Sequence, residues 1–219
     1  MAKMQGGLAP LEYASAERGK RWSLDEWGSY REYCSRNPQG HALFARRWKY
    51  DFVPFRGGLD LLFGDPRRGK LKPDDPMSLL GVFSKTGLVF GFACETEEYH
   101  HRNRYERSLV GRHISYWVGR DASKYLPGVY WLTVVSRPRL AAAELGTESL
   151  GAVGKVLSLG ADHVALQAFD KPADWLAHSE RLDRFCHDAP GVFSLQRIRA
   201  GLDRLDPGEA LDEAVKGWR

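Results

Sequence analysis

The sequence has few of the features that identify a disulfide-rich, metal-bound or membrane-spanning protein. Its three cysteines, Cys34, Cys94 and Cys186, are too few and too widely spaced for a disulfide framework or a CxxC zinc site. The N-terminus lacks the apolar core of a secretory signal, and no apolar run approaches the ~20 residues that span a bilayer. We therefore expect a cytoplasmic protein in a reducing compartment, with no membrane partner.

The chain also lacks a strong charge of either sign. Lysine and arginine number 32 and aspartate and glutamate 28 in 219 residues, whereas a nucleic-acid binder usually has a larger basic excess. A hydrophobic content of 43% with 12% aromatic residues is typical of a globular protein. Any electropositive surface should therefore be local.

Several motifs of catalysis and cofactor binding are missing. Gly69 and Lys70 resemble the end of a phosphate-binding loop, but Leu71 stands where serine or threonine should bind magnesium. His100 and His101 are adjacent and point in different directions, and the sequence contains neither HExxH nor the GxSxG elbow. We expect no cofactor, no metal and no catalytic residue, and an enzyme using histidine acid/base groups has no supporting motif.

The first part of the chain is expected to hold an arm, a helix and strands. Residues 1–21 have no sustained period and predict a loosely ordered arm. Ser23 and Glu26 match a capping box, which predicts a helix over 24–36. Short apolar groups over 41–63 predict strands and turns.

The middle of the chain combines loops and strands. The proline- and charge-rich residues 64–76 predict a surface loop. The apolar runs 77–84 and 88–94 flank a short glycine-containing connection and predict a β-hairpin. The polar block that follows, to residue 111, is compatible with a helix or a long loop. Further strands are expected over 113–118 and 129–135.

Helices dominate the rest of the chain. We predict helices over 139–145 and 150–159, a strand over 163–169, a helix from Pro172 and amphipathic helices within 195–218. This order is not a regular βα alternation. It predicts an α+β fold with a mainly antiparallel sheet flanked by helices and a helical C-terminal segment, in a single domain over 22–219.

The most basic stretch runs from Tyr99 to Lys124. It contains six cations and two anions, a net charge of +4 that equals the excess of the whole chain. Such a local field attracts a carboxylate, a phosphate or an acidic protein surface. On nucleic acid, Arg102, Arg104 and Arg107 would contact phosphates while a tyrosine stacks on a base.

A purely structural interpretation of this stretch is favoured over phosphate recognition. In it, Tyr105 packs inward and the arginines pair with Glu97, Glu98 or Glu106. The neighbouring aromatic residues, such as Tyr130 and Trp131, alternate along expected strands and are predicted to fill the core.

The residues RHISYWVGRD and YLPGVYWLTVVSRPRLAAAELG resemble a known family. An aromatic strand precedes a small helix here, in the pattern of the bacterial immunity proteins associated with type VI secretion effectors. The matching residues are Gly128, Val129, Trp131, Leu132 and Leu140. The resemblance extends over residues 77–190.

This resemblance implies a protein without catalytic activity that binds a cognate antibacterial effector toxin and protects the cell that makes it. Such a protein needs a rigid scaffold and a complementary surface of about 800 Å² per partner. The basic stretch is the expected contact surface, with partner-binding residues His100, His101, Arg102, Arg104, Tyr105, Arg107, Arg112 and Arg120. A nucleic-acid-binding or nucleic-acid-processing protein is the alternative, and a homo-oligomer is left open.

Overall fold

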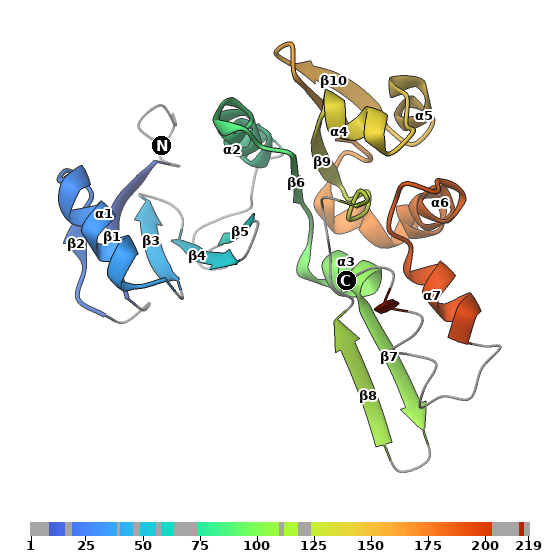
Figure 1. Ribbon diagram of the computed structural model, residues 1–219, viewed down its shortest axis with the longest axis horizontal. Helices are drawn as coiled ribbons and strands as arrows, with labels where there is room; N and C mark the ends of the chain where they lie inside the picture. The colour runs from blue at the N-terminus through green and yellow to red at the C-terminus, as the bar shows by residue number, and fades with distance from the viewer. Residues whose placement is uncertain are drawn as a thin grey trace. The chain divides into compact units, whose positions relative to one another are not determined.

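The computed structural model divides the chain into two compact units, Met1–Val82 and Phe83–Arg219 (Figure 1). It describes residues 9–15, 19–38, 40–45, 49–55, 58–63, 74–109, 112–117, 124–202 and 215–216. Both units combine antiparallel sheets with helices, so the predicted α+β class is confirmed. The division into two units differs from the single domain that the sequence predicts.

The N-terminal unit is built on a five-stranded antiparallel sheet with the order β2-β1-β3-β4-β5. Its strands are β1 (Pro10–Ala14), β2 (Trp22–Ser23), β3 (His41–Ala45), β4 (Lys49–Phe55) and β5 (Gly58–Phe63). The expected loose arm is therefore wrong over Pro10–Ala14, which pairs with strands on both sides. Tyr13 and Ala14 are buried, and this burial holds a short strand that has no clear period.

Helix α1 (Trp27–Arg36) confirms the predicted helix but begins three residues later than expected. The capping box does not form, because the Ser23 hydroxyl donates to Asp25 and Glu26 makes no side-chain cap. The helix is held instead by its buried Tyr30, whose hydroxyl lies 2.8 Å from the ring Nε2 of His41.

The predicted hairpin is wrong in its first half. Residues 77–83 belong to helix α2 (Asp74–Phe83), which is followed by a 3-10 turn over Ser84–Thr86. The apolar run suits either structure by periodicity, but two acidic residues and a proline directly before it are a helix-start signal. The predicted loop over 64–76 is therefore wrong over residues 74–76, and residues 64–73 lie outside the described part of the chain.

The C-terminal unit contains a four-stranded antiparallel sheet with the order β10-β11-β9-β6 (Figure 1). Its strands are β6 (Phe90–Ala93), β9 (Leu132–Ser136), β10 (Lys155–Leu159) and β11 (His163–Gln167). A separate hairpin pairs β7 (Arg104–Leu109) with β8 (Arg112–Trp117). The expected strands near 88–94, 113–118, 129–135 and 163–169 are thus present with shifted ends.

Helices flank this sheet. They are α3 (Thr96–Asn103), α4 (Arg137–Ala142), α5 (Thr147–Gly151), α6 (Trp175–Asp188), which follows the 3-10 turn Pro172–Asp174, and α7 (Leu195–Leu202). The predicted helix over 150–159 is wrong, because the chain turns after α5 and enters β10. Gly154 lies at this turn, where an added Cβ would come within 2.5 Å of the Gln167 carbonyl oxygen, so only glycine fits.

The core of the C-terminal unit lies where β9 meets the helices. Tyr130 and Trp131 are 0% and 1% exposed, which confirms their predicted place in the core. A second apolar cluster joins the hairpin to α7 and contains Tyr105, Tyr125, Phe193, Leu195, Ile198, Leu202 and Val215. Among the helices that the structure describes, none combines the length and the apolar character that crossing a bilayer requires.

Candidate functional site

Helix α3 places charged side chains inside the C-terminal unit. Glu98 is 0% exposed, and Arg102, one helical turn later, is 6% exposed. Residues four apart share one face of a helix, and this face of α3 points into the protein. Two buried charges at this spacing are costly unless they are paired and hydrogen-bonded, so their surroundings decide what they do.

Glu98 is held by two donors from different elements. The Arg102 side chain donates its Nε hydrogen to Glu98 Oε1 over 3.2 Å, and the backbone amide of Trp131 donates to the same oxygen over 3.1 Å. The carboxyl group therefore joins α3 to the chain that enters β9. The other oxygen, Oε2, is buried without a hydrogen-bond partner in the described structure.

Asp183 of α6 closes the network from the other side. Arg102 donates from Nη1 to Asp183 Oδ1 over 2.6 Å, while His101 Nε2 lies 2.7 Å from Asp183 Oδ2. The Arg102 guanidinium thus lies between two carboxyl groups that are 85 residues apart in sequence. We call Glu98, His101, Arg102 and Asp183 the buried ionic network.

Burial dominates the electrostatics of this network. It raises the pKa of Glu98 to about 7, against the lowering effect of the Arg102 charge and of the hydrogen bonds to the carboxylate. Burial alone would lower the pKa of Arg102, but its anionic neighbours outweigh this effect, and the net shift is upward. Burial likewise raises the pKa of the nearby Cys186 thiol to about 11. The arginine therefore stays charged and the thiol protonated, whereas burial brings the pKa of Glu98 close to neutral pH.

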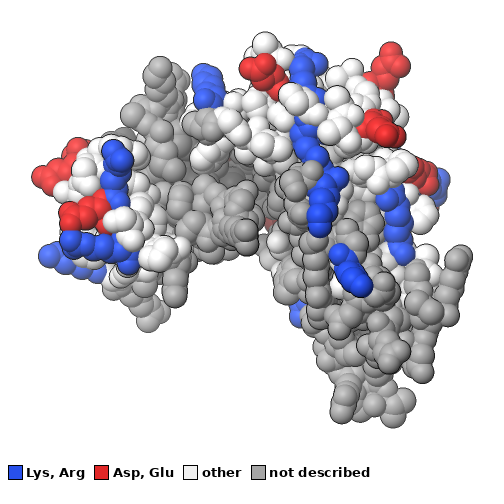
Figure 2. All heavy atoms as spheres, in the orientation of Figure 1, with Lys and Arg blue, Asp and Glu red and all other residues white. Residues whose placement is uncertain are grey.

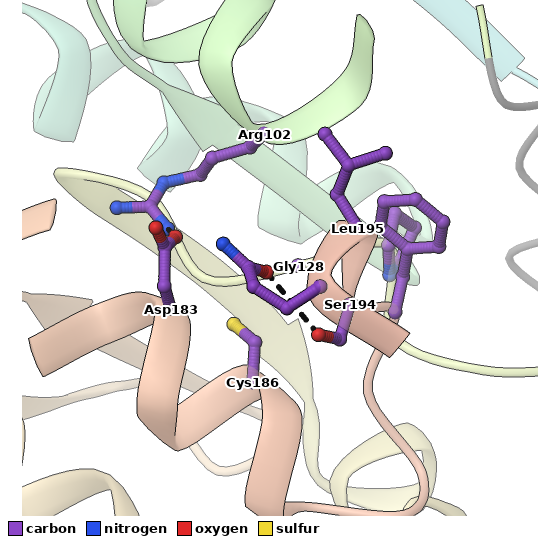
Figure 3. A pocket seen from close by; sticks show the side chains of 9 residues that line it. Arg102, Gly128, Asp183, Cys186, Ser194 and Leu195 are labelled. Carbon is purple, nitrogen blue, oxygen red and sulfur yellow. Dashed lines mark hydrogen bonds and ion pairs between the residues drawn. The ribbon is translucent and has the colours of Figure 1, made fainter. Parts of the chain in front are cut away.

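A small cavity of about 10 Å³ adjoins the network (Figure 3). It is lined by Arg102, Asp183 and Cys186 on one side and by Gly128, Ser194 and Leu195 on the other (Figure 3). A space of this size holds about one water molecule. It is far below the ~300 Å³ of a small-molecule site, so this cavity is too small for a substrate. Asp183 also lines a second, more open hollow of about 550 Å³ between α6 and α7.

Further polar contacts surround the network. Tyr130 donates its hydroxyl hydrogen to Asn103 Oδ1 over 2.9 Å, and the Trp131 indole donates to the carbonyl of Phe169 over 3.0 Å. Both rings are buried, and both polar groups are satisfied. The residues that carry the family resemblance lie in the same place: Gly128, Val129, Trp131, Leu132 and Leu140 are all buried.

The structure divides the predicted partner-binding residues between interior and surface. Arg102 is buried in the ionic network, and Tyr105 is 7% exposed in the apolar cluster. Neither can lie on a contact surface, which corrects that part of the expectation. Arg104 is partly exposed and pairs with Glu106 over 2.9 Å. The structural interpretation of this stretch is therefore confirmed for these three residues.

The other predicted residues are less enclosed or lie beyond the description. His101 keeps 28% of its side chain exposed, with its ring centroid 5.4 Å from that of Trp175. His100 is half-buried near Tyr99. In the β7–β8 hairpin the backbone of Arg107 lies opposite Ile114 and that of Arg112 opposite Leu109. The side chains of both arginines, and the whole of Arg120, lie outside the described part of the chain.

Sequence reasoning named Glu98 only as one of three acidic partners for the arginines, and it missed Asp183. The i,i+4 spacing of Glu98 and Arg102 is a local signal for their pairing. No local signal points to Asp183, because it enters from a helix about eighty residues later. Within the described ranges, no group of three or more histidine, cysteine or acidic residues is placed to hold a metal ion.

Comparison with known proteins adds no assignment: no family model, curated protein or solved structure matches this chain.

Proposed function

We propose that this chain is a non-catalytic immunity protein that binds a cognate antibacterial effector toxin and neutralises it. The observation that carries the proposal is the contact of buried Arg102 with Glu98 and Asp183 in the interior, which leaves this arginine no role at a catalytic or phosphate site. These charges connect α3, α6 and the start of β9. By joining these elements they make the scaffold rigid. A protein that works by presenting a fixed surface requires such a scaffold.

The proposed contact surface lies at the start of α6. Leu176 is 68% exposed, the highest value among the large apolar residues that the structure describes in this unit, and its neighbour Trp175 contacts His101. An aromatic and an aliphatic side chain beside polar groups are the kind of anchor that contributes most to protein binding. His101 is the member of the buried ionic network that contacts this surface, and it also contacts Asp183.

Charge is a second observation in support of a protein partner. Lysine and arginine side chains are spaced along one face of the C-terminal unit, from the β10 end toward α3, with acidic side chains at its borders (Figure 2). Such an arrangement favours a toxin that presents acidic groups. The nucleic-acid alternative is weakened, because buried Arg102 cannot reach a phosphate.

The test is toxin neutralisation in bacteria. The chain is produced together with the toxin encoded beside its gene, and cell survival and co-purification are measured. Leu176→Asp should abolish survival and co-purification while the protein stays folded, because most of the Leu176 side chain is exposed and little of it packs inside the protein. Ala177→Asp, at the next exposed position of α6, is the matched control and should leave both intact.

The opposite results would be equally clear. Survival that is unchanged by Leu176→Asp removes the α6 surface from the proposal. If the wild-type chain neither binds nor protects, and instead binds duplex DNA with a steep salt dependence, the nucleic-acid alternative replaces the immunity proposal.

A further inference from the structure

Strand β10 forms one border of the four-stranded sheet of the C-terminal unit (Figure 1). It pairs with β11 in a regular register from Lys155 to Leu159, without a bulge. No other strand in the described part of the chain pairs with it. Its Val156, Leu157 and Leu159 side chains are half-buried, while Lys155 and Ser158 are exposed.

The hydrogen bonds of the sheet show which backbone groups of β10 face outward. Ala168 N donates to Trp131 O over 2.8 Å, in register with the β9–β11 ladder. In an antiparallel pair, hydrogen-bonded positions alternate along the strand. Val164 and Leu166 therefore bond to β9, and Ala165 bonds to β10.

The same alternation extends across β10. Leu157 lies opposite Ala165, and Lys155 and Leu159 lie two residues away on either side. These three positions bond to β11, so the N–H and C=O groups of Val156 and Ser158 point away from the sheet. The Ser158 hydroxyl accepts a hydrogen bond from Arg137 over 3.2 Å, which fixes the side chain and leaves the backbone edge open.

We propose that this edge pairs with β10 of a second copy of the chain, antiparallel and centred on Leu157. In this register Val156 lies opposite Ser158 of the second copy, and each such pair exchanges both of its N–H···O bonds. Leu157 meets the second copy's Leu157 as a non-hydrogen-bonded pair, the type whose side chains are closest. The two sheets then continue as one across the two-fold axis.

The sequence of β10 favours its own copy as the occupant. Lys155 lies opposite Leu159 in this register, so the two lysines do not face each other. The strand has no proline and no bulge, and its one charge lies at its first residue, so most of the features that block edge pairing are missing. Each copy supplies what the other lacks, two outward amides and two outward carbonyls.

The first test is self-association of the full-length chain without any toxin, which keeps it independent of the proposed function. Sedimentation equilibrium should show a mass that rises with concentration toward that of two chains. Val156→Pro removes an outward N–H without touching the bonds to β11, so it should keep the chain monomeric with an unchanged unfolding curve. Leu157→Pro is the matched control and should destabilise the fold, because it removes a bond to β11.

A cross-link provides the second test if Val156→Pro does not fold. In a Cys34→Ser, Cys94→Ser background, Leu157→Cys should form a disulfide-linked dimer on mild oxidation, because the paired positions have the Cα separation of a disulfide. Glu148→Cys, exposed on α5, should not. A wild-type chain that stays monomeric, a dimer that persists in Val156→Pro, or equal cross-linking of the two cysteine variants would overturn the proposal.

Discussion

The central prediction concerns the buried carboxyl group of Glu98. Two physical effects, desolvation and attraction to Arg102, predict opposite changes in stability when its charge is removed. Glu98→Gln keeps the shape of the side chain and the acceptor for Arg102 and Trp131, but removes the negative charge. If desolvation dominates, the buried charge destabilises the fold and glutamine raises the free energy of unfolding. If the attraction to Arg102 dominates, glutamine breaks a buried ion pair and costs about 3–5 kcal/mol.

The structure favours the first outcome above neutral pH. Burial raises the pKa of Glu98 from an ordinary 4.5 to about 7. A folded-state pKa above the unfolded one gives stability that is present at low pH and lost as the pH rises through the folded value. At about 1.4 kcal/mol for each pKa unit, this loss amounts to about 3 kcal/mol.

The other groups around Glu98 stay in place in the variant. They are Arg102 and His101 on α3, Asp183 and Cys186 on α6, and the Trp131 amide. The two proteins differ in sequence only at this side chain. The difference between their free energies of unfolding therefore reports the loss of the Glu98 charge.

The assay is urea unfolding followed by circular dichroism at several pH values from about 5 to about 8. The free energy of unfolding of the wild type should fall relative to that of Glu98→Gln, until the variant is the more stable by up to about 3 kcal/mol. Parallel pH profiles, or a variant that is the less stable at pH 8 by several kcal/mol, would refute the dominance of burial.

Three further predictions concern packing and reactivity. Gly191→Ala should lower the free energy of unfolding by about 1–3 kcal/mol, because the added Cβ would lie 2.3 Å from a backbone oxygen. Gly151→Ala, whose Cβ would enter open space, is the control and should change the free energy of unfolding little. Urea unfolding curves of the two variants test this difference. Tyr130→Phe removes the hydroxyl that donates to Asn103 and should cost about 1–2 kcal/mol in the same assay, and an unchanged midpoint would contradict that role. Cys186 is fully buried with a raised pKa, so a thiol reagent should label it only as fast as the protein unfolds, which mass spectrometry of timed samples would show.

Parts of the fold were accessible from the sequence because local patterns specify them. Helix α1, strand β11 and helix α6 follow from periodic apolar positions with clear ends. The burial of Tyr130 and Trp131 follows from large aromatic side chains within a strand-like run.

The errors share one physical cause, which is that short apolar runs suit either a helix or a strand. Residues 77–83 became helix α2 and residues 155–159 became strand β10, each against the prediction. In the second case, the close approach of Gly154 to the Gln167 backbone decides the outcome. Contacts of this kind exist only after distant segments have met.

The candidate site shows the same division. The pairing of Glu98 with Arg102 is available from a spacing of four residues on a helix, and it was among the expectations. The contribution of Asp183 was not, because two helices must pack before a carboxylate from α6 can meet the arginine of α3. The expected cationic surface failed at Arg102 for this reason: its charge was counted from the sequence, but its neutralisation depends on the fold.

The amino-acid sequence alone determined the class of the fold, the positions of most helices and strands, and the concentration of charge between residues 99 and 124. Only the tertiary structure decided which of those charges face water, because burial depends on where α6 packs against α3. It also decided that β10 ends a sheet with two backbone positions facing outward. Local composition sets what a segment is able to form, whereas desolvation and pairing are properties of segments that have come together.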